Sequence, residues 1–160
     1  MNRILHSLSQ QSPHAARIVL GLVFFVFGLN GFLHFLPQPP LPDAALPFIS
    51  GLASSGYLFP VLKGVEVVAG VMLLASFMVP LALALLAPII VNIALFHVLL
   101  APGLPMVVLL LGLEIYLAWS YRAAFAPMLK LRVTPTSALR ARSGHAPSAP
   151  AFSPDQPAHP

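Results

Sequence analysis

Residues 16–36 read ARIVLGLVFFVFGLNGFLHFL, an apolar run whose one formally charged residue, Arg17, stands near its start. A helix rises about 1.5 Å per residue, so a run of this length crosses the ~30 Å hydrocarbon core of a membrane. A cleaved signal peptide has a shorter apolar core and a small-residue cleavage site after it. The residues from Leu33 to Pro37 offer no such site, and we therefore expect a retained transmembrane helix.

Three further apolar stretches of similar length follow, at residues 57–78, 79–100 and 105–121. Hydrophobic residues make up 58% of the 160-residue chain and charged residues only 8%, whereas soluble domains carry about 25% charged residues. A backbone that crosses lipid must satisfy its hydrogen bonds internally, and the alternating pattern of barrel strands is absent. The sequence therefore predicts an all-α fold, a bundle of four transmembrane helices.

The basic residues are unevenly distributed around these stretches. Arg3 and Arg17 accompany the start of the first stretch, whereas the connection at residues 37–56 contains neither Lys nor Arg. The largest group follows the fourth stretch and consists of Arg122, Lys130, Arg132, Arg140 and Arg142. Because Lys and Arg gather on the cytoplasmic side of a membrane, we expect both termini in the cytoplasm. An even number of spans also places both termini on the same side of the membrane.

The remaining segments complete the predicted organisation. Residues 1–15 form a cytoplasmic N-terminal segment, and residues 16–122 form the transmembrane domain. In the first connection, a proline-rich start precedes a segment that suits a short helix on the outer surface. Residues 123–160 form a basic juxtamembrane part, suited to anionic lipid head groups, and a disordered tail rich in Pro, Ala and Ser.

The composition argues against nucleic-acid binding and against any role for cysteine. The basic residues are not interleaved with aromatic residues, so nucleic-acid binding is not expected. The chain has no cysteine, which excludes disulfides and Cys-ligated metals within this chain.

Seven polar side chains interrupt the apolar stretches. A charged side chain at mid-bilayer costs about 2.5–3.5 kcal/mol, so each needs a partner, water or a function. Counting the rise along each helix places four of them in one layer about 10 Å below the outer edge and three nearer the outer face. The first group is Asn30, Glu66, Asn92 and Glu114, and the second is His34, Lys63 and His97. We predict that this polar layer binds a ligand or a partner.

The charged residues of the layer leave alternatives open. Lys63 and Glu66 are three residues apart and can pair within one helix. That pair either fixes the helix register, or leaves Glu66 as a proton acceptor or a hydrogen-bond partner for a ligand. Glu114 has no cation in its own stretch, so it is either protonated or paired with Lys63.

The uncharged members also have two interpretations each. Asn30 and Asn92 form interhelical hydrogen bonds or contact a ligand. His34, which we expect to share a helix face with Asn30 four residues earlier, and His97 are hydrated or relay protons. They could also bind metal, but no metal site is predicted. Pro88 removes one helix hydrogen bond, either beside a functional cavity or as an ordinary kink.

Glycines accompany the polar residues. We expect Gly28, Gly31 and Gly70 to let neighbouring helices approach closely. Gly70 follows Glu66 by four residues and continues its stripe on the helix.

Several short motifs resemble the DoxX-like family of small four-helix bacterial membrane proteins. They are Gly28-Leu29-Asn30-Gly31-Phe32, then Ser55-Gly56-Tyr57, and then the Leu62–Gly70 segment with its Glu66-x-x-x-Gly70 spacing. An arginine before the first stretch also fits, and the resemblance covers residues 17–121. The resemblance implies location in the bacterial inner membrane and association with membrane oxidoreductases, with quinone as a ligand.

These observations favour a non-catalytic accessory subunit of a quinone-linked redox complex. Its polar layer would hold a ligand or a partner subunit, and a homo-oligomer is a further prediction. The chain has no thiol, haem-ligand pair or nucleotide motif, so we do not expect it to catalyse a redox reaction alone. Two alternatives remain, a transporter of protons or small solutes, and a purely structural membrane protein.

Overall fold

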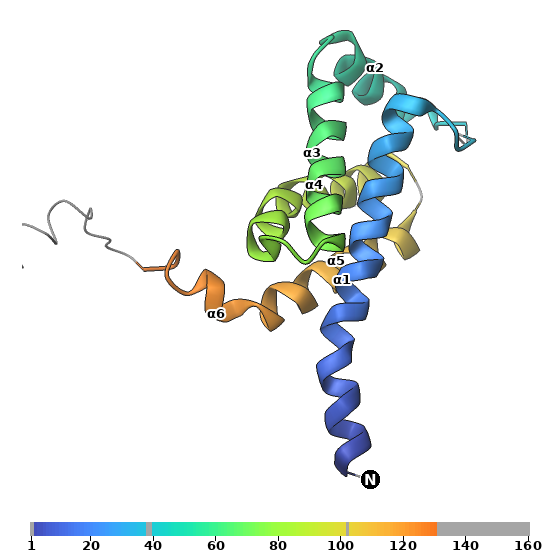
Figure 1. The fold of residues 1–160 in the computed structure, drawn as a ribbon. Coiled ribbons are helices and arrows are strands. Elements are labelled where there is room, and N and C mark those ends of the chain that lie inside the picture. The colour runs from blue at the N-terminus through green and yellow to red at the C-terminus, as the bar shows by residue number, and fades with distance from the viewer. Residues whose placement is uncertain (1, 38–39, 102, 131–160) are drawn as a thin grey trace, which may run out of the picture. The chain divides into compact units, whose positions relative to one another are not determined.

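The computed structural model describes residues 2–37, 40–101 and 103–130, with side chains from Ser12 onward. Every regular element in these ranges is a helix (Figure 1), which confirms the all-α prediction. The elements are α1 (Asn2–Leu33), η1 (Asp43–Ala45), α2 (Leu46–Ser54), α3 (Leu58–Leu74), α4 (Val79–Leu99), α5 (Leu104–Ser120) and α6 (Arg122–Phe125).

The helices belong to one unit that ends at Ala126, and a second unit begins at Pro127. The first residues after the fourth apolar stretch are thus helical, as α6. The predicted disordered tail falls mainly on residues 131–160, which lie outside the described residues.

Two of the described helices are long and apolar enough to cross a membrane, α1 over Ser12–Leu33 and α4 over Val79–Leu99. A third span results if Asp43–Ser54 and Leu58–Leu74 count as one span with a 90° bend. The apolar helix α5 has 17 residues and is shorter than these. The membrane character of the chain is therefore supported, whereas the four-span bundle remains a prediction.

The second apolar stretch was expected to be helical to residue 78, but α3 ends at Leu74. Ser76 and Met78 adopt left-handed backbone conformations, with φ of 58° and 46°. A helix cannot continue through such residues. The chain therefore turns within four residues and begins α4 at Val79.

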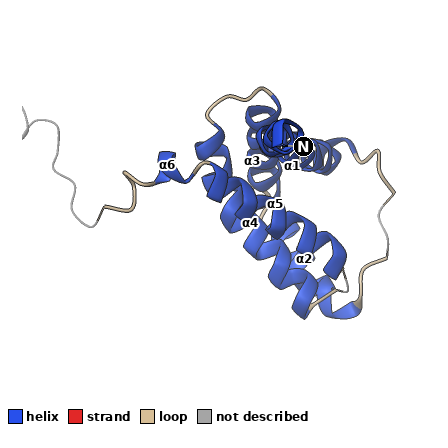
Figure 2. Cartoon of the chain, turned by 90° about the horizontal axis from the view of Figure 1, so that it is seen from below, coloured by secondary structure: helices blue, strands red, loops and turns tan. Residues whose placement is uncertain are grey.

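The long helices form two pairs. α1 packs along α3, and α4 packs along α5, while α3 also contacts α4 and α1 contacts α5. Figure 2 looks nearly along α1 and α3, and in this view α4 and α5 run across them. The two pairs therefore cross in this structure instead of lying parallel.

The apolar core lies where these pairs meet. Its largest fully buried side chains come from all four long helices and are Leu20, Leu73, Leu83, Leu86, Ile90 and Leu117. Those from α4 recur at three- and four-residue intervals, so one face of that helix is buried.

Glycines bring the backbones of α1 and α3 together. A Cβ atom on Gly70 would lie 2.6 Å from the backbone nitrogen of Phe25, and one on Gly28 would lie 2.9 Å from the backbone nitrogen of Val67. Real side chains do not tolerate such distances, so only glycine allows this helix separation. Gly21 belongs to the same contact, because its Cβ would lie 3.0 Å from the Leu73 side chain.

Candidate functional site

Lys63 and Glu66 form an ion pair at the α1–α3 interface. The Lys63 Nζ lies 2.8 Å from Glu66 Oε2 and 3.1 Å from Oε1, so the ammonium donates to both carboxylate oxygens. The glutamate side chain is 3% exposed and the lysine side chain 19%. The Phe59 ring adds a cation–π contact, with its centroid 5.7 Å from Nζ.

The glycines of α1 give this pair its position. A Cβ atom on Gly31 would lie 2.6 Å from Lys63 Cδ, which shows that the lysine stem occupies the groove left by the missing side chain. A Cβ atom on Gly28 would lie 3.1 Å from Glu66 Cβ. The pair is therefore held by the same stripe that brings the two helices together.

Asn30, one residue before Gly31, is buried, but its hydrogen bonds are to residues nearby in the sequence. Its side-chain Oδ1 accepts a hydrogen bond of 2.7 Å from the backbone N–H of Leu36, and its carbonyl accepts one of 3.0 Å from the N–H of His34. The side chain therefore satisfies a backbone N–H of the segment that follows α1 and ties that segment to the end of the helix.

His34 does not share a helix face with Asn30, contrary to the sequence expectation. The helix ends at Leu33, and His34 takes a left-handed conformation with φ of 50° and is exposed. The four-residue spacing places two residues on one face only while the helix continues.

Glu114 lies on α5, in the other helix pair. Its side chain is 8% exposed, and Oε2 is buried without a hydrogen-bond partner. Among the described side chains the single ion pair is that of Lys63 with Glu66, so the structure contains no Lys63–Glu114 pair. Glu114 therefore stands apart from the pair at the α1–α3 interface.

A small surface pocket of about 140 Å³ adjoins Glu114 between α4, α5 and α6. Its other lining residues are Leu83, Ala84, Ala87, Ala118 and Phe125. Pro88 has no N–H and so cannot bond to the carbonyl of Ala84. Two of the residues that line the pocket thus carry an unpartnered group, Glu114 with its buried Oε2 and Ala84 with a carbonyl that lacks its usual helical partner.

Asn92 and His97 do not join either carboxylate. Asn92 is exposed on α4. His97 Nδ1 lies 2.8 Å from the carbonyl oxygen of Ile93, and because a carbonyl only accepts, Nδ1 carries the proton.

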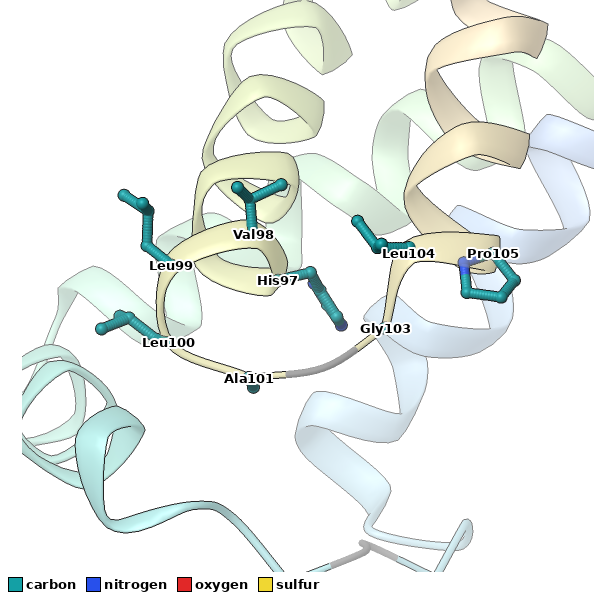
Figure 3. Close-up of a pocket in the computed structure, with 8 residues that line it drawn as sticks. All are labelled: His97, Val98, Leu99, Leu100, Ala101, Gly103, Leu104 and Pro105. Carbon is teal, nitrogen blue, oxygen red and sulfur yellow. The ribbon is translucent and has the colours of Figure 1, made fainter.

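A surface pocket of about 690 Å³ surrounds the connection from α4 to α5, and His97 forms part of its wall. Figure 3 shows the His97 ring pointing toward Gly103, where a side chain would collide with the ring. The remaining lining residues are mostly apolar. Among the described side chains no three His, Asp or Glu residues gather as a metal site requires.

One buried charge lies outside the predicted site. Arg17 is 6% exposed, and its Nη1 donates to the carbonyl of Leu73 and, at 3.3 Å, to that of Leu74. These carbonyls end α3, where a cation also complements the helix dipole. The spacing of Arg17 from Gly21 and Gly28, four and eleven residues, is the sequence signal that places it on the stripe facing α3.

The structure thus divides the predicted polar layer. Lys63 and Glu66 meet against Gly28 and Gly31, while Glu114 lines a separate pocket. Comparison of the chain with models of protein families, with curated proteins and with solved structures finds no match.

Proposed function

We propose that the chain is a non-catalytic subunit of a quinone-linked complex in the bacterial inner membrane, of the kind the DoxX-like motifs indicate. In this proposal α1, α3, α4 and α5 all cross the bilayer, with both termini in the cytoplasm, and the α4–α5 pair, which crosses α1 and α3 in this structure, aligns with them in the membrane. The 17 residues of α3 and of α5 lie at the lower limit of spanning length, which is about 17–25 residues.

The observation that carries the proposal is the Lys63–Glu66 pair. An ammonium group has three N–H donors, and the Glu66 oxygens accept two of them. The lysine side chain is 19% exposed, and among the described residues its Nζ has no acceptor other than these two oxygens. A quinone carbonyl, or a carbonyl of a partner subunit, is an acceptor that suits the third donor.

The structural alternative rests on the same residues. The pair satisfies both carboxylate oxygens, and the lysine stem packs on Gly31. A buried pair of this kind can fix helix packing without binding anything. In that case replacement of both residues by apolar ones leaves the function intact.

The transporter alternative draws on Glu114. Its unpartnered Oε2 beside a pocket is the arrangement of a group that exchanges a proton or binds a donor. In liposomes, proton or solute flux that disappears in Glu114→Gln and persists in Lys63→Met with Glu66→Leu would favour transport over the quinone-linked role.

The test of the proposal is purification of the full chain in mild detergent, with mass spectrometry of every co-purifying protein and lipid. We expect a quinone or an oxidoreductase subunit with the unmodified chain, and its loss from the double variant Lys63→Met with Glu66→Leu. Glu114→Gln is the matched control, because it removes a carboxylate in the other helix pair and should retain the bound partner. Equal recovery from all three proteins would overturn the assigned site.

The proposed topology has a separate test. The chain has no native cysteine, so single cysteines can be introduced and labelled. Ser55→Cys, in the first connection, should react with a membrane-impermeant maleimide in intact cells. Ser120→Cys, at the end of α5, should react only after the membrane is permeabilised. Reaction of both in intact cells would contradict the proposed orientation.

A further inference from the structure

Helix α4 has a buried face and an opposite exposed face. The buried positions include Ala82, Leu83, Leu86 and Ile90. On the exposed face six residues recur at alternating intervals of four and three: Leu81, Leu85, Pro88, Asn92, Leu95 and Leu99. This alternation is the seven-residue pattern with which one helix packs along another in a coiled coil. We call these six residues the α4 seam.

Asn92 is the polar member of the seam. It lies thirteen residues after Val79 and seven before Leu99, which is roughly 20 Å and 10 Å of helix. α4 is long and apolar enough to span a membrane, and where it does so, as in the proposed function, this position falls within the hydrocarbon. The Asn92 amide forms no hydrogen bond in the part of the chain that the structure describes. An amide left unpaired in lipid is unfavourable, so the side chain requires a partner beyond the described residues.

We propose that the partner is a second copy of this chain, which packs its α4 seam against the first so that the two Asn92 amides bond to each other. Two copies inserted in the same direction have parallel α4 helices, and a twofold axis along the membrane normal then brings each seam residue opposite its own equivalent. An amide both donates and accepts, so a pair of Asn92 side chains satisfies itself.

Two features favour a second copy over a different protein. The α4 seam carries no charged residue, so two identical surfaces meet without repulsion. A different partner would need its own polar side chain at the depth of Asn92, whereas the second copy supplies one by symmetry. A single asparagine at a core position of a coiled coil is also known to fix register and the number of helices. The proposal goes beyond the quinone-linked function and uses neither Lys63 nor Glu66.

Cysteine cross-linking tests the seam, because the chain has no native cysteine. The full chain carrying Leu95→Cys is reconstituted in vesicles of phosphatidylethanolamine and phosphatidylglycerol and oxidised with copper phenanthroline. The matched control is Val68→Cys on α3, since Leu95 and Val68 are 54% and 56% exposed. Disulfides form only where Cα atoms approach within about 7 Å. We expect covalent dimer from Leu95→Cys and little from Val68→Cys, and equal yields would overturn the seam.

The amide is tested in the same Leu95→Cys protein. Asn92→Leu should weaken dimerisation about three- to tenfold, as judged by cross-linked fraction against the protein-to-lipid ratio. Asn92→Gln keeps an amide and should retain most of the dimer. Because Asn92 is exposed, neither change disturbs the core, and circular dichroism should show unchanged helix content. Undiminished cross-linking in Asn92→Leu would overturn the proposed amide pair.

Discussion

Arg17 of α1 donates from Nη1 to the carbonyl of Leu73, the penultimate residue of α3, across 56 positions of sequence. A second hydrogen bond of 3.3 Å reaches the carbonyl of Leu74. The last carbonyls of a helix have no partner within it, and here a buried guanidinium supplies one. The same contact joins α1 to the end of α3.

Loss of this cap should destabilise the fold. Arg17→Met keeps much of the apolar stem and removes the donors, so the Leu74 carbonyl loses its hydrogen bond from Arg17 and the Leu73 carbonyl keeps the N–H of Ser76. We expect a decrease of about 1–3 kcal/mol in the free energy of unfolding, measured by denaturant titration in detergent micelles. Arg122→Met is the control, because Arg122 is exposed and bonds to the carbonyl of Trp119 at 3.0 Å. A similar loss in both variants would show that Arg17 has no special capping role.

The glycines of α3 offer a matched pair of substitutions. Gly70→Ala places a Cβ atom 2.6 Å from the backbone of Phe25, whereas Gly64→Ala meets no atom within 4 Å. Gly70→Ala should therefore force α1 and α3 apart and cost about 1–3 kcal/mol. Gly64→Ala should stabilise the helix by about 0.5–1 kcal/mol through its greater helix propensity. Thermal unfolding followed by circular dichroism checks both signs, and stabilisation by Gly70→Ala would refute the close contact.

The Lys63–Glu66 pair should respond differently to single and double substitution. Lys63→Met leaves the Glu66 carboxylate, 3% exposed, without its cation, and should cost about 3 kcal/mol of unfolding free energy. The double variant Lys63→Met with Glu66→Leu removes both charges and should recover most of that loss. A double-mutant cycle in micelles measures the coupling. If the two single effects simply add, the side chains do not interact in solution.

The helical elements could be predicted from sequence because the length of each apolar run can be counted directly in the sequence, without knowledge of the tertiary packing. The start of α4 at Val79 and the helical character of its whole run agree with that prediction. The end of α3 at Leu74 depends on left-handed residues at Ser76 and Met78, and on capping by Arg17 from another helix. Neither the left-handed residues nor the contact from Arg17 can be recognised from the local pattern of hydrophobicity.

The candidate site was less accessible to sequence reasoning. Counting the helical rise gives a depth for each polar residue but not the direction in which it faces. Lys63 and Glu66 lie in one helix, and their three-residue spacing brings them together whatever the tertiary packing. Asn92 is exposed because the face of α4 opposite to it packs into the core, whereas Glu114 is buried because it lies on the face of α5 that packs into the core. Which face of a helix is buried is a property of the whole fold.

Glu114 yields the last prediction. Its Oε2 is buried without a partner, and an unsatisfied buried polar atom costs about 1–3 kcal/mol. Glu114→Leu removes that atom at similar volume, so we expect it to raise the free energy of unfolding by about 1 kcal/mol or more. Glu114→Ala removes the same atom but enlarges the pocket, and the cavity should cancel the gain.

The comparison is made by denaturant titration in lipid-free micelles and again after reconstitution in native lipids. Stabilisation by Glu114→Leu in both settings means that the carboxyl has no partner and that its retention serves something other than stability. Destabilisation confined to native lipids would mean that a membrane component donates to Glu114. Destabilisation in micelles as well would contradict the unpartnered carboxyl, because the loss would then require a donor within the chain itself.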